Sequence, residues 1–128
     1  GLSCSFAEAE VFEAMRKFVS GGKKFDMITL DPPAFTKSKK KIREALKGYK
    51  EINVSAMKLL RQDGILFTSS CSYHITWQDF SVMLSDAARD ARRKFVVIAH
   101  GFQSDDHPVL LNFPESSYLK ALFLRMIQ

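Results

Sequence analysis

Short apolar runs alternate with longer amphipathic segments along this chain. Residues 25–30 and 95–99 are nearly continuous apolar runs, and such runs are typical of strands in a buried parallel sheet. Residues 65–70, which follow an Asp-Gly turn, and residues 118–126 are also predicted to be strands. A pair of prolines ends the first run, because proline donates no backbone hydrogen bond.

Three further segments have the apolar periodicity of helices: residues 7–20, 42–60 and 76–92. The third begins with a capping-box pattern, Thr76 followed by Asp79. Along the chain the order is helix, strand, helix, strand, helix, strand, strand. This order predicts an α/β fold with a mostly parallel sheet, in which the last two strands pair antiparallel because no helix separates them.

One polar side chain falls on the apolar face of the middle helix. Asn53 lies at helical spacing from Tyr49 and Ala56, so its amide points in the same direction as the core residues. Buried amide groups are nearly always hydrogen-bonded. We therefore expect Asn53 either to have a partner in the core or to stand at an opening in it.

The composition excludes several classes of protein. Of the 128 residues, 46% are hydrophobic and 26% are charged, which is typical of a globular domain rather than a disordered chain. No apolar run reaches the ~18 residues that a membrane-spanning helix needs, and the N-terminus lacks the pattern of a signal peptide. Two cysteines form no disulfide framework, so a reducing compartment, the cytoplasm, is expected.

The net charge of +5 is concentrated in one segment. Residues 37–50 contain seven basic residues and one acidic residue, so they carry +6 while the rest of the chain sums to −1. A basic segment on a nearly neutral domain favours contact with a polyanion at one place. The alternative interpretation is a solubilising surface, and charge by itself does not separate the two.

Two loops begin where predicted strands end, at Asp31-Pro32-Pro33 and at Cys71. Ligands of α/β sheets bind at the carboxyl ends of strands, so Asp31 and Cys71 face one crevice if their strands are neighbours. A thiol there is suited to nucleophilic attack, and the rigid turn is suited to hydrogen bonding with a base or a cofactor. The simpler interpretations are a small buried residue and a strand terminator.

Four aromatic residues lie close to these loops: Phe35, Tyr49, Tyr73 and Trp77. Aromatic rings near a crevice can stack on a nucleobase that has been flipped out of an RNA helix. Packing in the core is the alternative for each of them. His107 follows two acidic residues, but this spacing matches no usual ligand pattern, and no metal site is predicted.

In three segments the chain resembles the large-subunit ribosomal RNA cytosine-5 methyltransferases, a family that uses S-adenosylmethionine. The segments are FDMITLDPPAFTKSKKKIREALKGYKEIN, LLRQDGILFTSSCSYHI and HPVLLNFPESSYLKALFLRM. DPP alone occurs in many methyltransferases, whereas DPPAF, GYKEIN, SSCSYH and HPVLL in this order and spacing are together specific. The resemblance extends over nearly the whole chain from residue 6 and implies a Rossmann-like class I methyltransferase sheet.

The resemblance also implies roles for individual residues. Asp31, Pro32 and Pro33 match the motif that lines the cofactor and the target base, and Cys71 matches the catalytic nucleophile. In the implied reaction the Cys71 thiolate adds to carbon 6 of a flipped cytosine, and carbon 5 then takes the methyl group from S-adenosylmethionine. Asp31 would hold the cytosine edge. Glu10 lies near the position where the family has an Asp that reaches the adenine end of the cofactor.

Ribosomal RNA is the substrate that the resemblance implies. The basic segment then becomes a contact for RNA phosphates. Aromatic residues beside the loops become candidates to stack on a base. The predicted RNA-binding residues are Phe35, Lys37, Lys39, Lys40, Lys41 and Tyr49.

Three features of the family are missing from the sequence. The chain has six glycines but no G-x-G-x-G loop, the element that holds the methionine part of the cofactor. It also lacks the acidic residue that the family has after its second strand, and the N-terminal RNA-binding region. We therefore expect residues 1–128 to be the carboxyl-terminal part of a class I methyltransferase domain, without its N-terminal strands. Such a part would leave a sheet edge open, and a homodimer would cover it.

Two other functions stay open. In methyltransferases that act on an exocyclic amine, an aromatic residue directly follows the [DN]PP motif. Here Ala34 comes before Phe35, and Cys71 would have no role in that chemistry. The remaining alternative is a non-catalytic RNA-binding module, which predicts salt-sensitive RNA binding without binding of S-adenosylmethionine.

Overall fold

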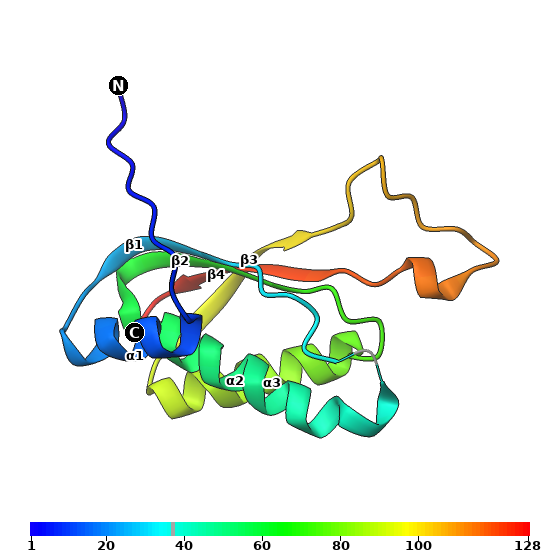
Figure 1. Ribbon diagram of the computed structural model, residues 1–128, viewed down its shortest axis with the longest axis horizontal. Helices are drawn as coiled ribbons and strands as arrows, with labels where there is room; N and C mark the ends of the chain where they lie inside the picture. Colours follow the sequence, from blue (N-terminus) through cyan, green and yellow to red (C-terminus); the bar gives the residue numbers. More distant parts are fainter. Residues whose placement is uncertain (37) are drawn as a thin grey trace.

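The computed structural model describes residues 1–36 and 38–128 as three helices packed on one mixed sheet (Figure 1). The elements are α1 (Val11–Ser20), β1 (Phe25–Leu30), the 3-10 helix η1 (Lys39–Lys41), α2 (Ile42–Leu59), β2 (Leu60–Ser70), α3 (Trp77–Ala91), β3 (Phe95–Gly101), the 3-10 helix η2 (Pro114–Ser116) and β4 (Lys120–Met126). Among the described residues, no helix combines the length and the apolar character needed to cross a membrane.

The strands are arranged in the order β1-β2-β4-β3. β1 and β2 are parallel, and β4 is antiparallel to both of its neighbours, β2 and β3. Three strands therefore run in one direction and only β4 runs the other way. The predicted α/β fold with an antiparallel last strand is confirmed, and the two strands that precede the candidate loops are direct neighbours.

The core lies between the sheet and the helices, all three of which cover the same face (Figure 1). Its largest fully buried side chains include Tyr49, Met57 and Phe80. Asn53 is also fully buried: its Nδ2 donates to the Tyr49 carbonyl oxygen at 2.8 Å, and its Oδ1 accepts from Thr68 Oγ1 at 2.8 Å. The expectation of a core partner for Asn53 is confirmed, and this partner links α2 to β2.

No helix in the described part of the chain covers the opposite face of the sheet (Figure 1). Met27 of β1, which alternates with the core residues Ile28 and Leu30, is accordingly 53% exposed. Within the described residues β1 pairs only with β2, so its other edge is open. β3 likewise pairs only with β4, so one face and both edges of this sheet are open in the described part of the chain.

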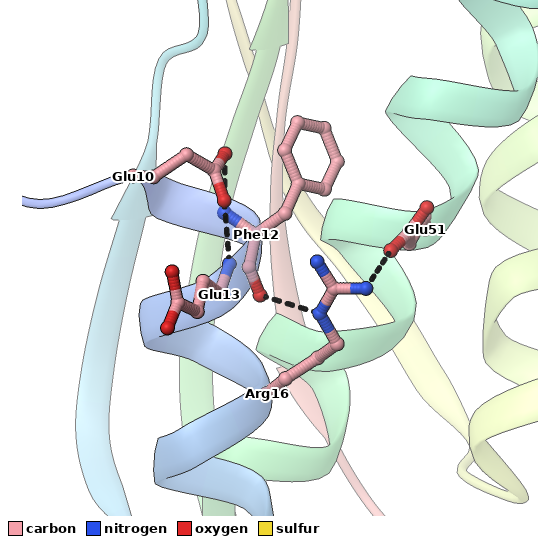
Figure 2. A network of polar contacts seen from close by, with 5 residues as sticks. All are labelled: Glu10, Phe12, Glu13, Arg16 and Glu51. Carbon is pink, nitrogen blue, oxygen red and sulfur yellow. Dashed lines mark hydrogen bonds and ion pairs between the residues drawn. The ribbon is translucent and has the colours of Figure 1, made fainter.

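Helix α1 begins four residues later than its periodicity predicts. Residues 1–10 are extended and exposed, and Glu10 is the N-cap. The Glu10 carboxylate accepts hydrogen bonds from the backbone N–H of Phe12 (3.1 Å) and Glu13 (2.8 Å) (Figure 2). These two N–H groups have no partner inside the helix, so the cap decides where the helix starts. Arg16 joins α1 to α2 through an exposed ion pair with Glu51.

β2 begins five residues earlier than predicted. The Asp-Gly pair that was predicted to form a turn lies inside the strand, where the register against β1 shifts between Phe25 and Met27. Asp63 has a positive φ of 62° there. A Cβ on Gly64 would lie 2.8 Å from the carbonyl oxygen of Arg61, so this position accepts only glycine. The Asp-Gly pair does change the direction of the backbone, but it does so as a break in the register within β2 rather than as a turn before the strand.

The connection between β3 and β4, residues 102–119, projects beyond the sheet (Figure 1). We call this segment the arm. It exposes several apolar side chains, among them Phe102 (78% exposed) and Leu111 (fully exposed). Its two ends return to the sheet beside the carboxyl ends of β1 and β2, where the candidate site lies.

Candidate active site

A pocket of about 600 Å³ lies at the carboxyl ends of β1 and β2. Its lining residues are Asp31, Pro32, Pro33, Cys71, Gln103, Ser104, His107, Tyr118 and Leu119. The crevice predicted to hold Asp31 and Cys71 together is therefore present. It forms because parallel strands bring their carboxyl ends to the same edge of the sheet.

Serines next to Cys71 fasten the two loops to each other. Ser69 Oγ donates to Asp31 Oδ1 at 2.5 Å. Ser72 Oγ donates to the carbonyl oxygen of Thr36 at 3.0 Å. Both serines are buried, whereas Cys71 between them is partly exposed. The Ser-Ser-Cys-Ser sequence thus holds the Asp31–Thr36 loop on both sides of a thiol that remains accessible.

Tyr49 lies beneath the Asp-Pro-Pro turn and does not reach the surface. Its side chain is fully buried, its hydroxyl donates to the Pro33 carbonyl oxygen at 3.5 Å, and its ring centroid lies 4.5 Å from that of Phe35. Burial raises the pKa of the Tyr49 phenol. The prediction that Tyr49 binds RNA is therefore wrong, because a fully buried ring cannot stack on a base. The helical periodicity, which places Tyr49 on the apolar face of α2, predicted its burial correctly.

Phe35 packs in the same aromatic cluster. Its ring contacts Tyr49 on one side and lies 6.1 Å from the ring of Phe12 on another, and Gly48 leaves the space that it occupies. The ring keeps some exposure. Phe35 therefore anchors the loop to α1 and α2, and its role as an RNA contact stays a prediction.

Lys120 is a buried cation behind Cys71. It is 4% exposed, and its Nζ donates to the carbonyl oxygens of Ser72 (2.5 Å) and Tyr118 (2.7 Å). Burial lowers the pKa of Lys120 to about 8, against the opposing pull of Cys71 and Asp79. The sequence analysis missed this residue, although a lysine at the start of the mostly apolar last strand was a signal that could have found it.

The arm supplies the remaining wall of the pocket, which the sequence analysis also missed. Gln103 closes its base: the side-chain Oε1 accepts from the backbone N–H of Tyr118 (3.0 Å) and Leu119 (3.3 Å), and Nε2 donates to the His107 carbonyl oxygen (2.9 Å). These contacts span up to 16 positions of the chain, so no local pattern predicts them.

Glu10 is not among the residues that line the pocket. Its carboxylate caps α1, and the N–H groups of Glu13 and Phe12 hold the pKa of Glu10 below its usual value of 4.5. Each carboxylate oxygen accepts one of these bonds and keeps a further lone pair. The cap does not exclude the predicted contact with a cofactor.

The basic segment follows the candidate loop directly. Lys37 lies outside the described residues. Lys39, Lys40 and Lys41 form η1 and are exposed, and the Ser38 side chain caps this short helix at its start. Farther along, Lys50 is committed to an ion pair with Asp90 at 2.8 Å. Among the described residues, the exposed positive charges that follow the candidate loop most closely in sequence are thus those of η1.

Proteins named ribosomal RNA large subunit methyltransferase I are similar to this chain in sequence. The protein of Tolumonas auensis is 43% identical over 122 residues, which is 95% of this chain and 31% of the relative. The protein of Pseudoalteromonas atlantica is 41% identical over 124 residues, again covering 31% of the relative. The chain thus spans about a third of the length of these curated relatives. No protein-family model matches it.

Solved structures agree in fold. SMU.776 with bound SAH superposes with a TM-score of 0.69 at 18% identity, covering 91% of this chain and 30% of that chain. A Streptococcus mutans protein assigned to the SAM-dependent methyltransferases superposes with a TM-score of 0.74 at 19% identity, covering 91% and 29%. The chain therefore has a Rossmann-like α/β fold that matches part of each of these structures. In open α/β sheets of this kind, ligands are expected at the carboxyl ends of the strands, where the pocket lies.

Proposed function

We propose that these residues are the part of a class I domain that carries the catalytic side of an S-adenosylmethionine-dependent methyltransferase, and that its substrate is large-subunit ribosomal RNA. The names of the curated relatives and the fold support this proposal. The observation that carries it is the pocket in which Asp31 and the accessible thiol of Cys71 lie together. Neither residue would need this placement in a module that only binds RNA.

We further propose that the methyl group goes to carbon 5 of a cytosine. The Cys71 thiolate forms a bond to carbon 6, and the electrons of the ring double bond move to carbon 5, which becomes nucleophilic. After carbon 5 has been methylated, a base removes its proton, the double bond re-forms and the carbon–sulfur bond breaks. Asp31, held in place by Ser69, would accept hydrogen bonds from the cytosine edge.

S-adenosylmethionine, when bound, supplies an electrophilic methyl group. The Asp31-Pro32-Pro33 turn fits the methyl-bearing end of this cofactor, because it is rigid, lines the open pocket and leaves Asp31 and Pro33 exposed. These residues would form one wall of the cofactor site. Glu10 stays a proposed contact for the adenine end.

The proposed RNA contacts are Phe35 and the exposed lysines of η1, Lys39, Lys40 and Lys41. These residues follow the Asp31-Pro32-Pro33 turn in the chain and supply positive charges and an aromatic ring, and cations favour phosphate binding. We also propose that two copies of the chain associate through the open edge of β1. Sedimentation equilibrium of the isolated chain tests this association.

Covalent trapping tests the proposed reaction. A chimera carries this chain in place of the aligned segment of the Tolumonas auensis relative, so that the remainder of that protein is present. With S-adenosylmethionine and large-subunit RNA that contains 5-fluorocytosine, the chimera should form a stable protein–RNA adduct, because fluorine cannot leave as a proton does. The Cys71→Ala chimera should form none, and the Cys4→Ala chimera should form as much as the parent.

Different failures point to different functions. Methylation of RNA without an adduct would support the exocyclic-amine alternative and reject Cys71 as the nucleophile. RNA binding without methylation, in a chimera that binds S-adenosylmethionine as tightly as the unmodified relative, would reject the enzyme proposal for this chain.

A further inference from the structure

Lys120 carries a buried positive charge without a carboxylate partner. It is 4% exposed, and its ammonium group donates to two main-chain carbonyl oxygens, those of Ser72 and Tyr118. It forms no ion pair with any acidic residue in the described part of the chain. A buried cation is costly unless a negative group compensates it. The proposed mechanism above gives this cation no role.

Two titratable groups act on Lys120 electrostatically. Cys71, in the loop after β2, has the larger effect, and Asp79, in the first turn of α3, has the smaller one. Both favour the charged ammonium.

The position of this cation is set by the main chain on two sides. Lys120 is the first residue of β4 and pairs with Ser70 of β2, directly before Cys71. Its bond to Ser72 holds the residue directly after Cys71, and its bond to Tyr118 holds the end of the arm. Lys120 therefore spans the Cys71 loop and ties it to the opposite wall of the pocket.

We propose that Lys120 is a positioning residue for Cys71, which holds the Cys71 loop through the Ser72 carbonyl and keeps a positive charge behind it. This inference rests on the proposed role of Cys71 as the nucleophile. It predicts that the reactivity of Cys71 depends on Lys120, and that this dependence weakens above about pH 8 as Lys120 loses its charge.

Alkylation of Cys71 by iodoacetamide tests this role without RNA or cofactor. The chain carries Cys4→Ser, so that Cys71 is its one thiol, and the rate is followed from about pH 6 to pH 10. In Lys120→Met the rate near pH 7 should fall about tenfold, because the Cys71 loop loses both its contact through the Ser72 carbonyl and the adjacent positive charge. Lys120→Arg should restore most of the rate, because arginine stays charged throughout this range.

The matched control is Lys94→Met, which removes an exposed lysine that precedes β3 at the opposite end of the sheet. Its alkylation profile should equal that of the parent. An unchanged profile in Lys120→Met would overturn the proposal, as would a loss that Lys120→Arg does not restore.

A second measurement leaves Lys120 in place. The side-chain ¹³Cε signal of Lys120 is titrated by NMR in the parent and in Cys71→Ser. Removal of the thiolate should move the Lys120 titration to lower pH, and identical titrations would overturn the proposed coupling. The alkylation rates and the NMR titration do not depend on the trapping experiment. Failure to trap an adduct rejects Cys71 as the nucleophile, whereas the alkylation rates and the titration test only the interaction between Lys120 and Cys71.

Discussion

Individual polar side chains, several of them short, organise the candidate site. Ser69 and Ser72 hold Asp31 and Thr36 by single hydrogen bonds, and Lys120 holds the main chain after Cys71. Buried groups of this kind contribute little when they are satisfied, but are costly when one partner is removed. A substitution of one of these buried side chains should therefore lower stability mainly through the hydrogen-bond partner that it leaves unpaired.

Lys120 should make the stability of the chain depend on pH. Its pKa is lowered from 10.5 to about 8 in the folded chain, so above pH 8 the unfolded chain binds more protons than the folded one. The free energy of unfolding should therefore gain about 1–2 kcal/mol between about pH 8 and pH 9.5. Urea unfolding at both pH values measures this gain. In Lys120→Met this increase in stability should disappear, and in Lys94→Met it should remain. An equal increase in the parent and both variants would contradict the attribution of the pH dependence to Lys120.

Asn53 and Thr68 should be energetically coupled. Thr68→Val leaves the Asn53 Oδ1 buried without a donor, and Asn53→Leu leaves the Thr68 hydroxyl without its acceptor. Each single substitution should cost about 1–3 kcal/mol in the free energy of unfolding. The double variant should cost about 1 kcal/mol less than the sum. Thr29→Val, on an exposed position of β1, is the matched control and should change stability by less than about 0.5 kcal/mol. Strict additivity would show that the bond is not an energetic link.

The first residues of α1 and α3 depend on the residues that cap their N-termini. α3 begins where the capping box of Thr76 and Asp79 predicts, because both reciprocal bonds form. α1 begins at Val11, because Glu10 supplies the cap and the preceding residues pack against nothing. Apolar periodicity alone placed the start of α1 too early, since periodicity does not report where the orphan N–H groups find partners.

Removal of the α1 cap should destabilise the chain near its N-terminus. Glu10→Ala should lower the midpoint of thermal unfolding by about 2–4 °C. It should also speed amide hydrogen exchange at Phe12 and Glu13, whose N–H groups donate hydrogen bonds to the Glu10 carboxylate. The folded pKa of Glu10 lies below 4.5, so this contribution should be present above that pH and be lost on acidification.

The matched control for the cap is Glu8→Ala, which removes an exposed carboxylate in the extended segment. It should leave both the midpoint and the exchange rates unchanged. Equal effects of the two substitutions would indicate a general charge effect rather than a cap.

The molecule as a whole has two very different faces. Helices cover one face of the sheet, while the other face exposes Met27, and β1 has an open edge. The pocket lies at the carboxyl ends of β1 and β2, and η1 follows the loop after β1 in the chain. A polyanionic substrate should therefore be bound from this end, and the strength of binding should depend on salt.

Charge reversal on η1 should weaken RNA binding. With Lys39→Glu and Lys40→Glu together, the affinity for large-subunit RNA should fall about tenfold at moderate salt, and the slope of log affinity against log salt should decrease by about 1–2. Fluorescence anisotropy over a salt series measures both quantities. The control, Lys58→Glu with Lys94→Glu, makes the same change in net charge at exposed lysines elsewhere. Equal losses in the two pairs would show that only net charge matters.

The amino-acid sequence by itself determined the order of the elements, the ends of β1 and α2, the capping box of α3 and the placement of Asp31 and Cys71 at strand ends. These follow from local signals: apolar periodicity, prolines and turn residues within a few positions of one another. The tertiary structure decided that Tyr49 supports the Asp-Pro-Pro turn through Pro33, that Lys120 lies behind Cys71 and that Gln103 closes the arm against the pocket. These contacts join residues 15 or more positions apart in the chain, and only the packing of the strands brings them together.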